Sequence, residues 1–227
     1  MCGVFFIFKI SPLPPMSKTN SDNLPSSSSH DWRTKDLELI NHLEVFENKP
    51  AILKKVEYRL IQLKKTMIQE LVPYAHQLPP GTDIKKGQIA RGENHNGFPF
   101  LSLDIPQNFS KTNWFTYRTL FWWGHYLGFA LILKGEKLKT YFQLLSTFSN
   151  EPSFHNVYLS LSPTPWEWHD SFFTPISNQR EWSDKIDHLD YMKILRVYPV
   201  AGDSFHSLDW TQAGINFWRD MTSITLE

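Results

Sequence analysis

The spacing of hydrophobic residues changes along the chain, and in the first part it is the spacing of an α-helix. Leu37, Ile40, Leu43 and Phe46 have the spacing of one apolar helix face, so a helix is predicted around residues 37–46. Pro50 fits the first turn of a second helix that carries a longer apolar stripe and ends before Pro73. The pattern therefore predicts an N-terminal helical hairpin. The stripe of the second helix consists of Ile52, Leu53, Val56, Leu60, Leu63, Met67, Ile68 and Leu71.

After Pro79-Pro80-Gly81 the pattern changes to short segments separated by Gly, Pro and Asn, which are typical of strands and hairpins. The early segments follow one another too closely for parallel crossover connections, which favours an antiparallel meander. Strands are predicted over residues 86–94, 98–104, 115–123, 126–133, 156–161 and 192–199.

Two later segments return to the helical period, at residues 136–148 and at about 210–222. Helices that interrupt or follow an antiparallel sheet bury their apolar stripe against one of its faces. We therefore expect a single α+β domain over residues 31–227. It would contain an antiparallel sheet with an N-terminal helical hairpin, one inserted helix and a C-terminal helix packed on one face.

Residues 1–30 have a different composition, rich in Ser, Asn and Pro, and are expected to form a disordered tail. The short apolar run at residues 4–8 lacks the basic flank and cleavage site of a secretory signal, and Met16 is an alternative start. The only cysteine, Cys2, allows neither an intramolecular disulfide nor a multi-cysteine zinc site. These features favour a cytoplasmic protein.

Charge and hydropathy limit the classes of partner. Lys plus Arg and Asp plus Glu both number 23, so no overall field attracts the chain to nucleic acid or to an anionic membrane. The apolar stretch 119–133 is shorter than the roughly 20 residues that a spanning helix needs. We therefore expect neither nucleic acid nor a membrane as a partner. A small molecule, another protein or a second copy of the chain remain as partners.

The most informative chemistry lies where ionisable side chains enter the aromatic segment 91–133. In an extended strand Arg91, Glu93 and His95 share one face, which predicts a continuous polar surface. Arg118 lies in an apolar strand and needs a carboxylate partner, for which Glu93 and Asp104 are the nearest candidates. Two interpretations stay open, because Arg forks serve both uses: a structural ion pair that fixes strand register, or an arginine that binds a ligand.

A second polar and aromatic cluster is Pro165-Trp166-Glu167-Trp168-His169-Asp170. Its Glu, His and Asp could perform acid–base chemistry, although the same residues suit a loop held by two tryptophans. The histidines show no metal-ligand spacing, so neither a metal nor a cofactor is expected. No phosphate-binding loop, dinucleotide fingerprint or nucleophile elbow occurs, which removes the main support for three large enzyme classes.

The runs Arg91-Gly-Glu-Asn-His-Asn-Gly-Phe-Pro-Phe and Arg118-Thr-Leu-Phe-Trp-Trp-Gly resemble a group of uncharacterised bacterial proteins. The resemblance covers residues 91–134 only. It implies a bacterial, cytoplasmic setting and brings no activity with it.

Two hypotheses follow. The first is a non-catalytic binding or interaction module with an aromatic, polar-edged pocket or a self-association surface. The second is a small enzyme without a recognisable motif, in which Glu93 and His95 act as acid–base groups and Arg118 as an anion clamp. The candidate ligand-binding residues are Arg91, Glu93, His95, Arg118, Trp122, His125, Glu167 and His169.

Overall fold

The computed structural model describes residues 31–225. The chain divides into two compact units, the first ending at Phe46 and the second beginning at Glu47, and each is described by itself. The predicted tail at residues 1–30, with Cys2 and Met16, lies outside the described residues.

The first unit contains α1 (Thr34–Ile40) and the first turn of α2 (Leu43–Leu71). The carboxylate of Asp36 accepts hydrogen bonds from the Arg33 backbone N–H at 3.0 Å and from its guanidinium at 2.7 Å, which caps the start of α1. The predicted single apolar face is divided, because Leu37 and Ile40 lie in α1 whereas Leu43 and Phe46 lie in α2, and all four side chains are exposed.

The predicted helical hairpin is wrong, because α2 runs as one helix from Leu43 to Leu71 with Pro50 inside it. The helix breaks earlier, at Asn41 and His42. Pro50 has no backbone N–H, so the Phe46 carbonyl lacks its usual intrahelical donor. The boundary between the two units also lies here, between Phe46 and Glu47. Beyond Pro50 the predicted stripe is confirmed, and the buried residues of α2 are Leu53, Val56, Leu60, Leu63, Met67 and Leu71.

The second unit is built on an antiparallel sheet of seven strands in the order β1-β2-β3-β4-β7-β5-β6. The first four strands form the predicted meander. Sequence reasoning missed the last edge strand, β6. The strands are β1 (Gln88–His95), β2 (Phe98–Phe109), β3 (Trp114–Trp122), β4 (Tyr126–Lys134), β5 (Tyr158–Ser160), β6 (Phe173–Pro175) and β7 (Met192–Pro199).

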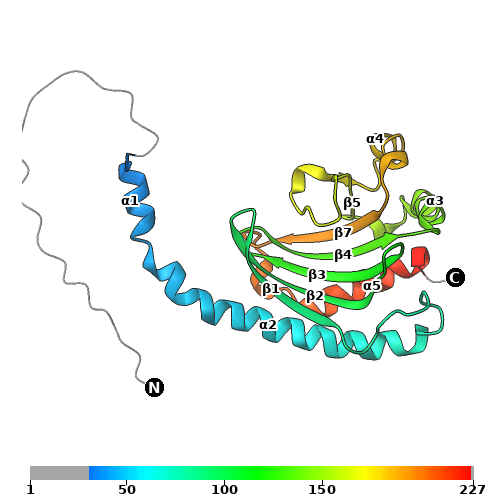
Figure 1. Cartoon of the computed structure of the whole chain (residues 1–227), viewed down its shortest axis with the longest axis horizontal. Coiled ribbons are helices and arrows are strands. Elements are labelled where there is room, and N and C mark those ends of the chain that lie inside the picture. Colours follow the sequence, from blue (N-terminus) through cyan, green and yellow to red (C-terminus); the bar gives the residue numbers. More distant parts are fainter. Residues whose placement is uncertain (1–30, 226–227) are drawn as a thin grey trace, which may run out of the picture. The chain divides into compact units, whose positions relative to one another are not determined.

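The predicted helices at residues 136–148 and 210–222 are present as α3 (Leu138–Phe148) and α5 (Trp210–Thr225), and α5 lies behind the strands in Figure 1. The C-terminal helix also packs on α2. A Cβ atom at Gly214 of α5 would lie 2.8 Å from Leu63 of α2 and 3.0 Å from Phe129 of β4, so glycine permits this close approach. Tyr117 of β3 donates a hydrogen bond to the Gly214 carbonyl at 2.7 Å.

Short helical turns connect these elements, and none of the described helices is long and apolar enough to cross a membrane. They are η1 (Val72–Tyr74), η2 (Pro152–Phe154), η3 (Asp170–Phe172), α4 (Gln179–Trp182), η4 (Ile186–His188) and η5 (Phe205–Ser207).

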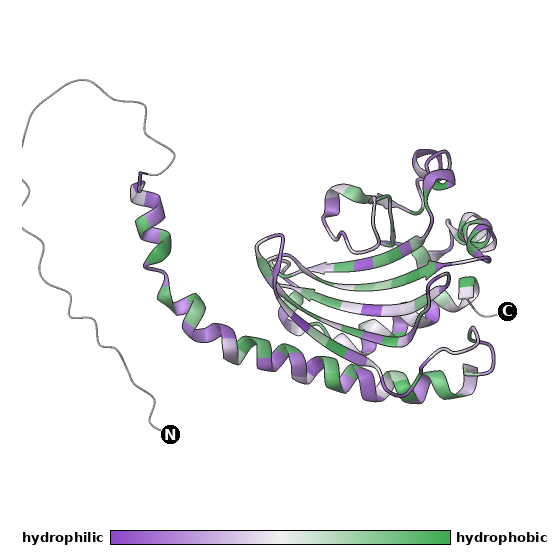
Figure 2. Cartoon of the chain, viewed as in Figure 1, coloured by the Kyte–Doolittle hydropathy of each residue, from purple (hydrophilic) through white to green (hydrophobic). Residues whose placement is uncertain are grey.

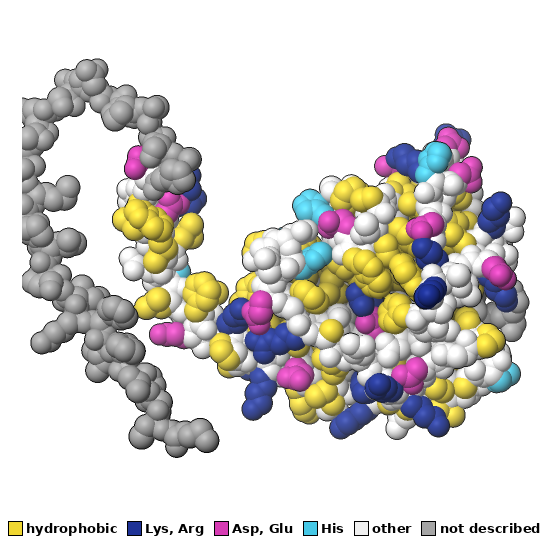
Figure 3. All heavy atoms as spheres, in the orientation of Figure 1, with side chains coloured by type: hydrophobic (Ala, Val, Ile, Leu, Met, Phe, Trp, Pro, Cys, Tyr) yellow, Lys and Arg dark blue, Asp and Glu magenta, His cyan; other side chains and the backbone are white. Residues whose placement is uncertain are grey.

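The two faces of the sheet differ. The face toward the helices is part of a large apolar core, whereas the opposite face, which we call the open face, carries a smaller cluster that includes Leu120, Trp122 and Trp168. Hydrophilic positions interrupt the hydrophobic strands in Figure 2. In Figure 3 the open face shows hydrophobic side chains around a few basic and acidic ones. Charged groups therefore lie inside an apolar surface.

Candidate functional site

The centre of the open face is an ion pair between neighbouring strands. Asp104 of β2 lies directly opposite Arg118 of β3. The guanidinium donates from Nε to Oδ1 and from Nη2 to Oδ2, both at 2.7 Å. Asp104 is only 3% exposed, and the Arg118 side chain is 17% exposed. Of the two carboxylates that the sequence offered to Arg118, the partner is therefore Asp104.

This pair leaves one nitrogen of the arginine, Nη1, uncommitted. Thr116 donates to Asp104 Oδ1 at 3.2 Å, which adds a third hydrogen bond to the carboxylate. Within residues 31–225, no group accepts a hydrogen bond from Nη1 of Arg118. A guanidinium held in place by a buried carboxylate is fixed in orientation, so its remaining N–H groups have a defined direction.

A pocket of about 290 Å³ lies beside this pair. The Trp166 ring stacks on the guanidinium, with 4.7 Å between Cζ of Arg118 and the ring centroid. Trp166 is 38% exposed, whereas Trp168 is buried. The volume is near the lower end of the roughly 300–1,000 Å³ of small-molecule sites, which suits one or two rings. The lining residues are His95, Phe100, Arg118, Leu120, Trp166 and Trp168.

The predicted polar trio on β1 is divided. The pairing of β1 with β2 shifts register between Gly92 and His95, so the simple alternation ends there. Glu93 instead forms exposed ion pairs with Lys49 at 2.5 Å and with Arg91 at 3.1 Å. Of the trio, only His95 lines the pocket.

The turn after β1 places His95. Asn96 and Gly97 both have positive φ, as a two-residue hairpin turn requires. The His95 ring lies edge-on to the Trp122 ring with centroids 5.1 Å apart, and its carbonyl accepts from Trp122 Nε1 at 3.1 Å. Burial lowers the pKa of His95, and the nearby Lys193 acts in the same direction while Glu167 opposes it. His95 is therefore neutral at pH 7, and its buried Nε2 has no partner within the described chain.

The loop before β6 forms the other wall, and Glu167 organises it. One oxygen of its carboxylate accepts from the backbone N–H groups of Trp168 and His169, both at 2.8 Å, and from Asn96 Nδ2 at 3.4 Å. Burial acts to raise the pKa of Glu167, but the two backbone donors and His95 outweigh it and lower the pKa. Glu167 is thus an ionised loop anchor.

Lys193 of β7 is the main residue that sequence reasoning missed. Its ammonium donates to the Pro165 carbonyl at 3.2 Å and to the Glu167 carbonyl, and lies 4.4 Å from the centroid of the Trp168 ring. Burial lowers its pKa to about 7, with Glu167 opposing and Arg118 reinforcing the shift. The signal was a lysine between Met192 and Ile194 in an apolar strand, which places it on the same face as Leu195.

Two predicted histidines lie outside the pocket lining. The His125 ring stacks on Trp122 with centroids 3.6 Å apart, and burial lowers its pKa, with His169 contributing. His169 is exposed and bonds to Ser171 at 2.8 Å. Trp122 holds His95 through the hydrogen bond to its carbonyl, and does not itself line the pocket.

The described residues contain no group of three or more His, Cys, Asp or Glu that could hold a metal ion. No family model matches the chain, and neither a curated protein nor a solved structure matches it. The chemistry of the pocket alone therefore supports a function.

Proposed function

We propose that this chain is a non-catalytic binding module whose open-face pocket holds a small planar molecule with one anionic or carbonyl oxygen group. The observation that carries the proposal is the Arg118 guanidinium. Two of its nitrogens are committed to Asp104, the third has no acceptor within residues 31–225, and Arg118 lines a pocket with tryptophan walls.

The donor set favours an acceptor on the ligand. Arginine only donates hydrogen bonds, and Arg118 is the one lining residue of this pocket that carries a permanent charge. A carboxylate would form a charge-assisted hydrogen bond there, which is stronger than a bond between neutral groups. His95, neutral at pH 7, adds a second polar atom that can donate or accept according to its tautomer.

The walls favour a flat apolar body. Trp166, Trp168 and Phe100 present ring surfaces, and aromatic rings pack well against one another at centroid separations of about 4.5–7 Å. The volume of about 290 Å³ limits the ligand to a molecule of one or two rings. An aryl carboxylate of the size of naphthoate has this shape and charge.

The enzyme hypothesis needs an acid–base pair at one cavity. Glu93 is committed to Lys49 and Arg91, and an oxygen of Glu167 is occupied by backbone donors. His95 then has no carboxylate partner in the pocket, and a single histidine beside an arginine fits ligand binding better than catalysis. We therefore propose binding rather than turnover.

Calorimetric titration of the full chain with 2-naphthoate tests this proposal. The neutral alcohol 2-naphthalenemethanol should bind roughly tenfold more weakly, because it lacks the charge that Arg118 recognises. Arg118→Lys should weaken naphthoate binding to a similar degree, since the forked donor is lost. Arg219→Lys is the matched control, because Arg219 forms a comparable bidentate pair with Glu70 outside the pocket.

A second variant guards against misfolding of Arg118→Lys. Trp166 is partly exposed, so Trp166→Ala should still fold but should lose most of the naphthoate affinity. The control is Trp32→Ala, at an exposed tryptophan that does not line the pocket, and it should keep that affinity. Equal binding of the acid and the alcohol, or full affinity in both pocket variants, would show that the pocket does not recognise a planar anion.

A further inference from the structure

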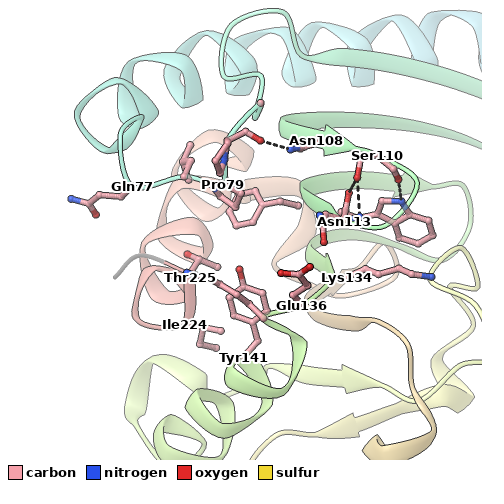
Figure 4. Close-up of a pocket in the computed structure, with 16 residues that line it drawn as sticks. Gln77, Pro79, Asn108, Ser110, Asn113, Lys134, Glu136, Tyr141, Ile224 and Thr225 are labelled. Carbon is pink, nitrogen blue, oxygen red and sulfur yellow. Dashed lines mark hydrogen bonds between the residues drawn. The ribbon is translucent and has the colours of Figure 1, made fainter.

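A larger cavity of about 590 Å³ lies apart from the open-face pocket, where the β2–β3 hairpin, the β4–α3 junction and the end of α5 meet (Figure 4). Its volume lies well within the roughly 300–1,000 Å³ of small-molecule sites. Its apolar walls come from separate parts of the chain: Leu78, Pro79, Pro80, Trp114, Phe115 and Ile224.

Most polar groups on its rim are committed to one another. Asn108 Nδ2 donates to the Pro80 carbonyl at 3.0 Å. Ser110 Oγ donates to the Asn113 carbonyl at 2.9 Å and accepts from the Asn113 N–H at 2.8 Å. Trp114 Nε1 donates to the Ser110 carbonyl at 2.9 Å. These bonds build the rim and leave those groups little capacity for a ligand.

The basic rim residue Lys134 is also occupied. Its ammonium pairs with Asp190 at 2.5 Å and lies 4.7 Å from the centroid of the Trp114 ring. In Figure 4 its side chain points away from the cavity. Lys137 lines the cavity as well, so an anionic ligand is the alternative that an experiment has to exclude.

Glu136 differs from these neighbours. Its carboxylate points into the cavity near Tyr141 in Figure 4. Within residues 31–225, Glu136 forms neither a hydrogen bond nor an ion pair. A carboxylate beside apolar and aromatic walls attracts a cation.

The backbone fixes the position of Glu136. Gly135 has φ of +129°, and a Cβ atom there would lie 2.0 Å from Oδ1 of Asn113. Only glycine fits this turn, which the hydrogen bond from the Leu138 N–H to the Gly135 carbonyl closes at 3.0 Å. The turn therefore fixes the backbone from which the exposed Glu136 side chain reaches the cavity.

We infer that this cavity is a second binding site, for a small organic amine whose apolar body packs against the cavity walls and whose ammonium group pairs with Glu136. The inference does not rest on the function proposed for the open face, although the Trp114 ring of this cavity lies 5.7 Å from the Trp166 ring of the open-face pocket, centroid to centroid. The cavity shares none of the residues that line the open-face pocket.

Titration of the full chain with phenethylamine, followed by calorimetry, tests this inference. The neutral isostere 2-phenylethanol should bind at least tenfold more weakly, because it cannot pair with the carboxylate. Glu136→Gln keeps the shape of the side chain and should lower phenethylamine affinity by a similar factor. Glu151→Gln, at an exposed glutamate outside the cavity, is the control and should bind normally.

Three results would overturn the inference: equal affinity for the amine and the alcohol, unchanged amine affinity in Glu136→Gln, or tighter binding of phenylacetate than of phenethylamine at this cavity. The third would assign the site to anions through Lys137. Saturating 2-naphthoate should leave amine affinity within twofold, so failure of one site is distinguishable from failure of the other.

Discussion

The same strands present apolar side chains on one face of the sheet and charged side chains on the other. Toward the helices, β3 and β4 present Tyr117, Phe121, Phe129 and Leu131, whose burial stabilises the fold. On the open face β2, β3 and β7 present Asp104, Arg118 and Lys193. Burying such charges costs free energy even when they are paired, so they are weak evidence for stability. The first face therefore accounts for the stability of the protein, and the second is the face on which we propose that a ligand binds.

The largest effect should come from the helix-covered face. Phe129→Ala should lower the free energy of unfolding by about 3–5 kcal/mol, because it leaves a cavity in a close-packed core. Trp166→Ala on the open face should cost less, about 1–2 kcal/mol, since the side chain is already 38% exposed. Urea denaturation of both variants measures the contrast. Equal losses would contradict the division of roles between the faces.

Changes to the ion pair should have an intermediate effect on stability, which depends on whether one partner or both are removed. Asp104→Ala should lower the free energy of unfolding by about 2–3 kcal/mol, somewhat less than for a fully buried pair, because Arg118 keeps some access to solvent. The double variant Asp104→Leu with Arg118→Met should recover most of that loss, since no charge is left unpaired. If the double variant is as unstable as the single one in urea, the role of the pair is to stabilise the sheet rather than to bind a ligand.

Lys193 should make stability depend on pH. Its pKa is about 7 in the folded chain against 10.5 ordinarily, so between these values the unfolded chain holds a proton that the folded chain lacks. The free energy of unfolding should therefore rise from about pH 7 to 9.5 relative to that of Lys193→Met. Below pH 7 the lysine is protonated in both states, so this rise with pH should be absent there. Urea denaturation at several pH values measures the difference. Parallel curves for the two proteins would show that burial does not depress this pKa.

The smallest effect should appear at the edge of the sheet. Glu93→Gln removes exposed ion pairs with Lys49 and Arg91, and such pairs contribute little in water. Both the melting temperature and the affinity for 2-naphthoate should stay close to those of the unmodified chain, with affinity within twofold by calorimetry. A tenfold loss of binding would restore Glu93 to the site and revive the enzyme hypothesis.

Much of the fold was predictable because it depends on local periodicity. The stripe from Leu53 to Leu71 and the alternation in β1 to β4 depend on neighbours in the sequence, and their boundaries agree to within a few residues, apart from a longer β2. The helix through Pro50 was not predictable, because continuation past a proline depends on packing elsewhere. The edge strand β6 is too short to show a period.

The site was predictable only in part. Asp104 was named as a partner for Arg118, and antiparallel register brings them together. A single register shift separated His95 from Glu93, and nothing in the local pattern marks where such a shift occurs. Lys193 joins the site through the pairing of β7 with β4, which depends on sheet order. Long-range pairing is therefore what the sequence alone left open.

We propose that Arg118 and the two tryptophans of the open-face pocket hold a planar anion. Nitrogen-15 NMR of the indole N–H groups, recorded while 2-naphthoate is added, tests it most directly. The signals of Trp166 and Trp168 should shift and saturate, those of Trp182 and Trp218 in the helix-covered core should stay fixed, and Arg118→Lys should reduce the shifts strongly. Fixed Trp166 and Trp168 signals, or equal shifts in Arg118→Lys, would contradict the claim.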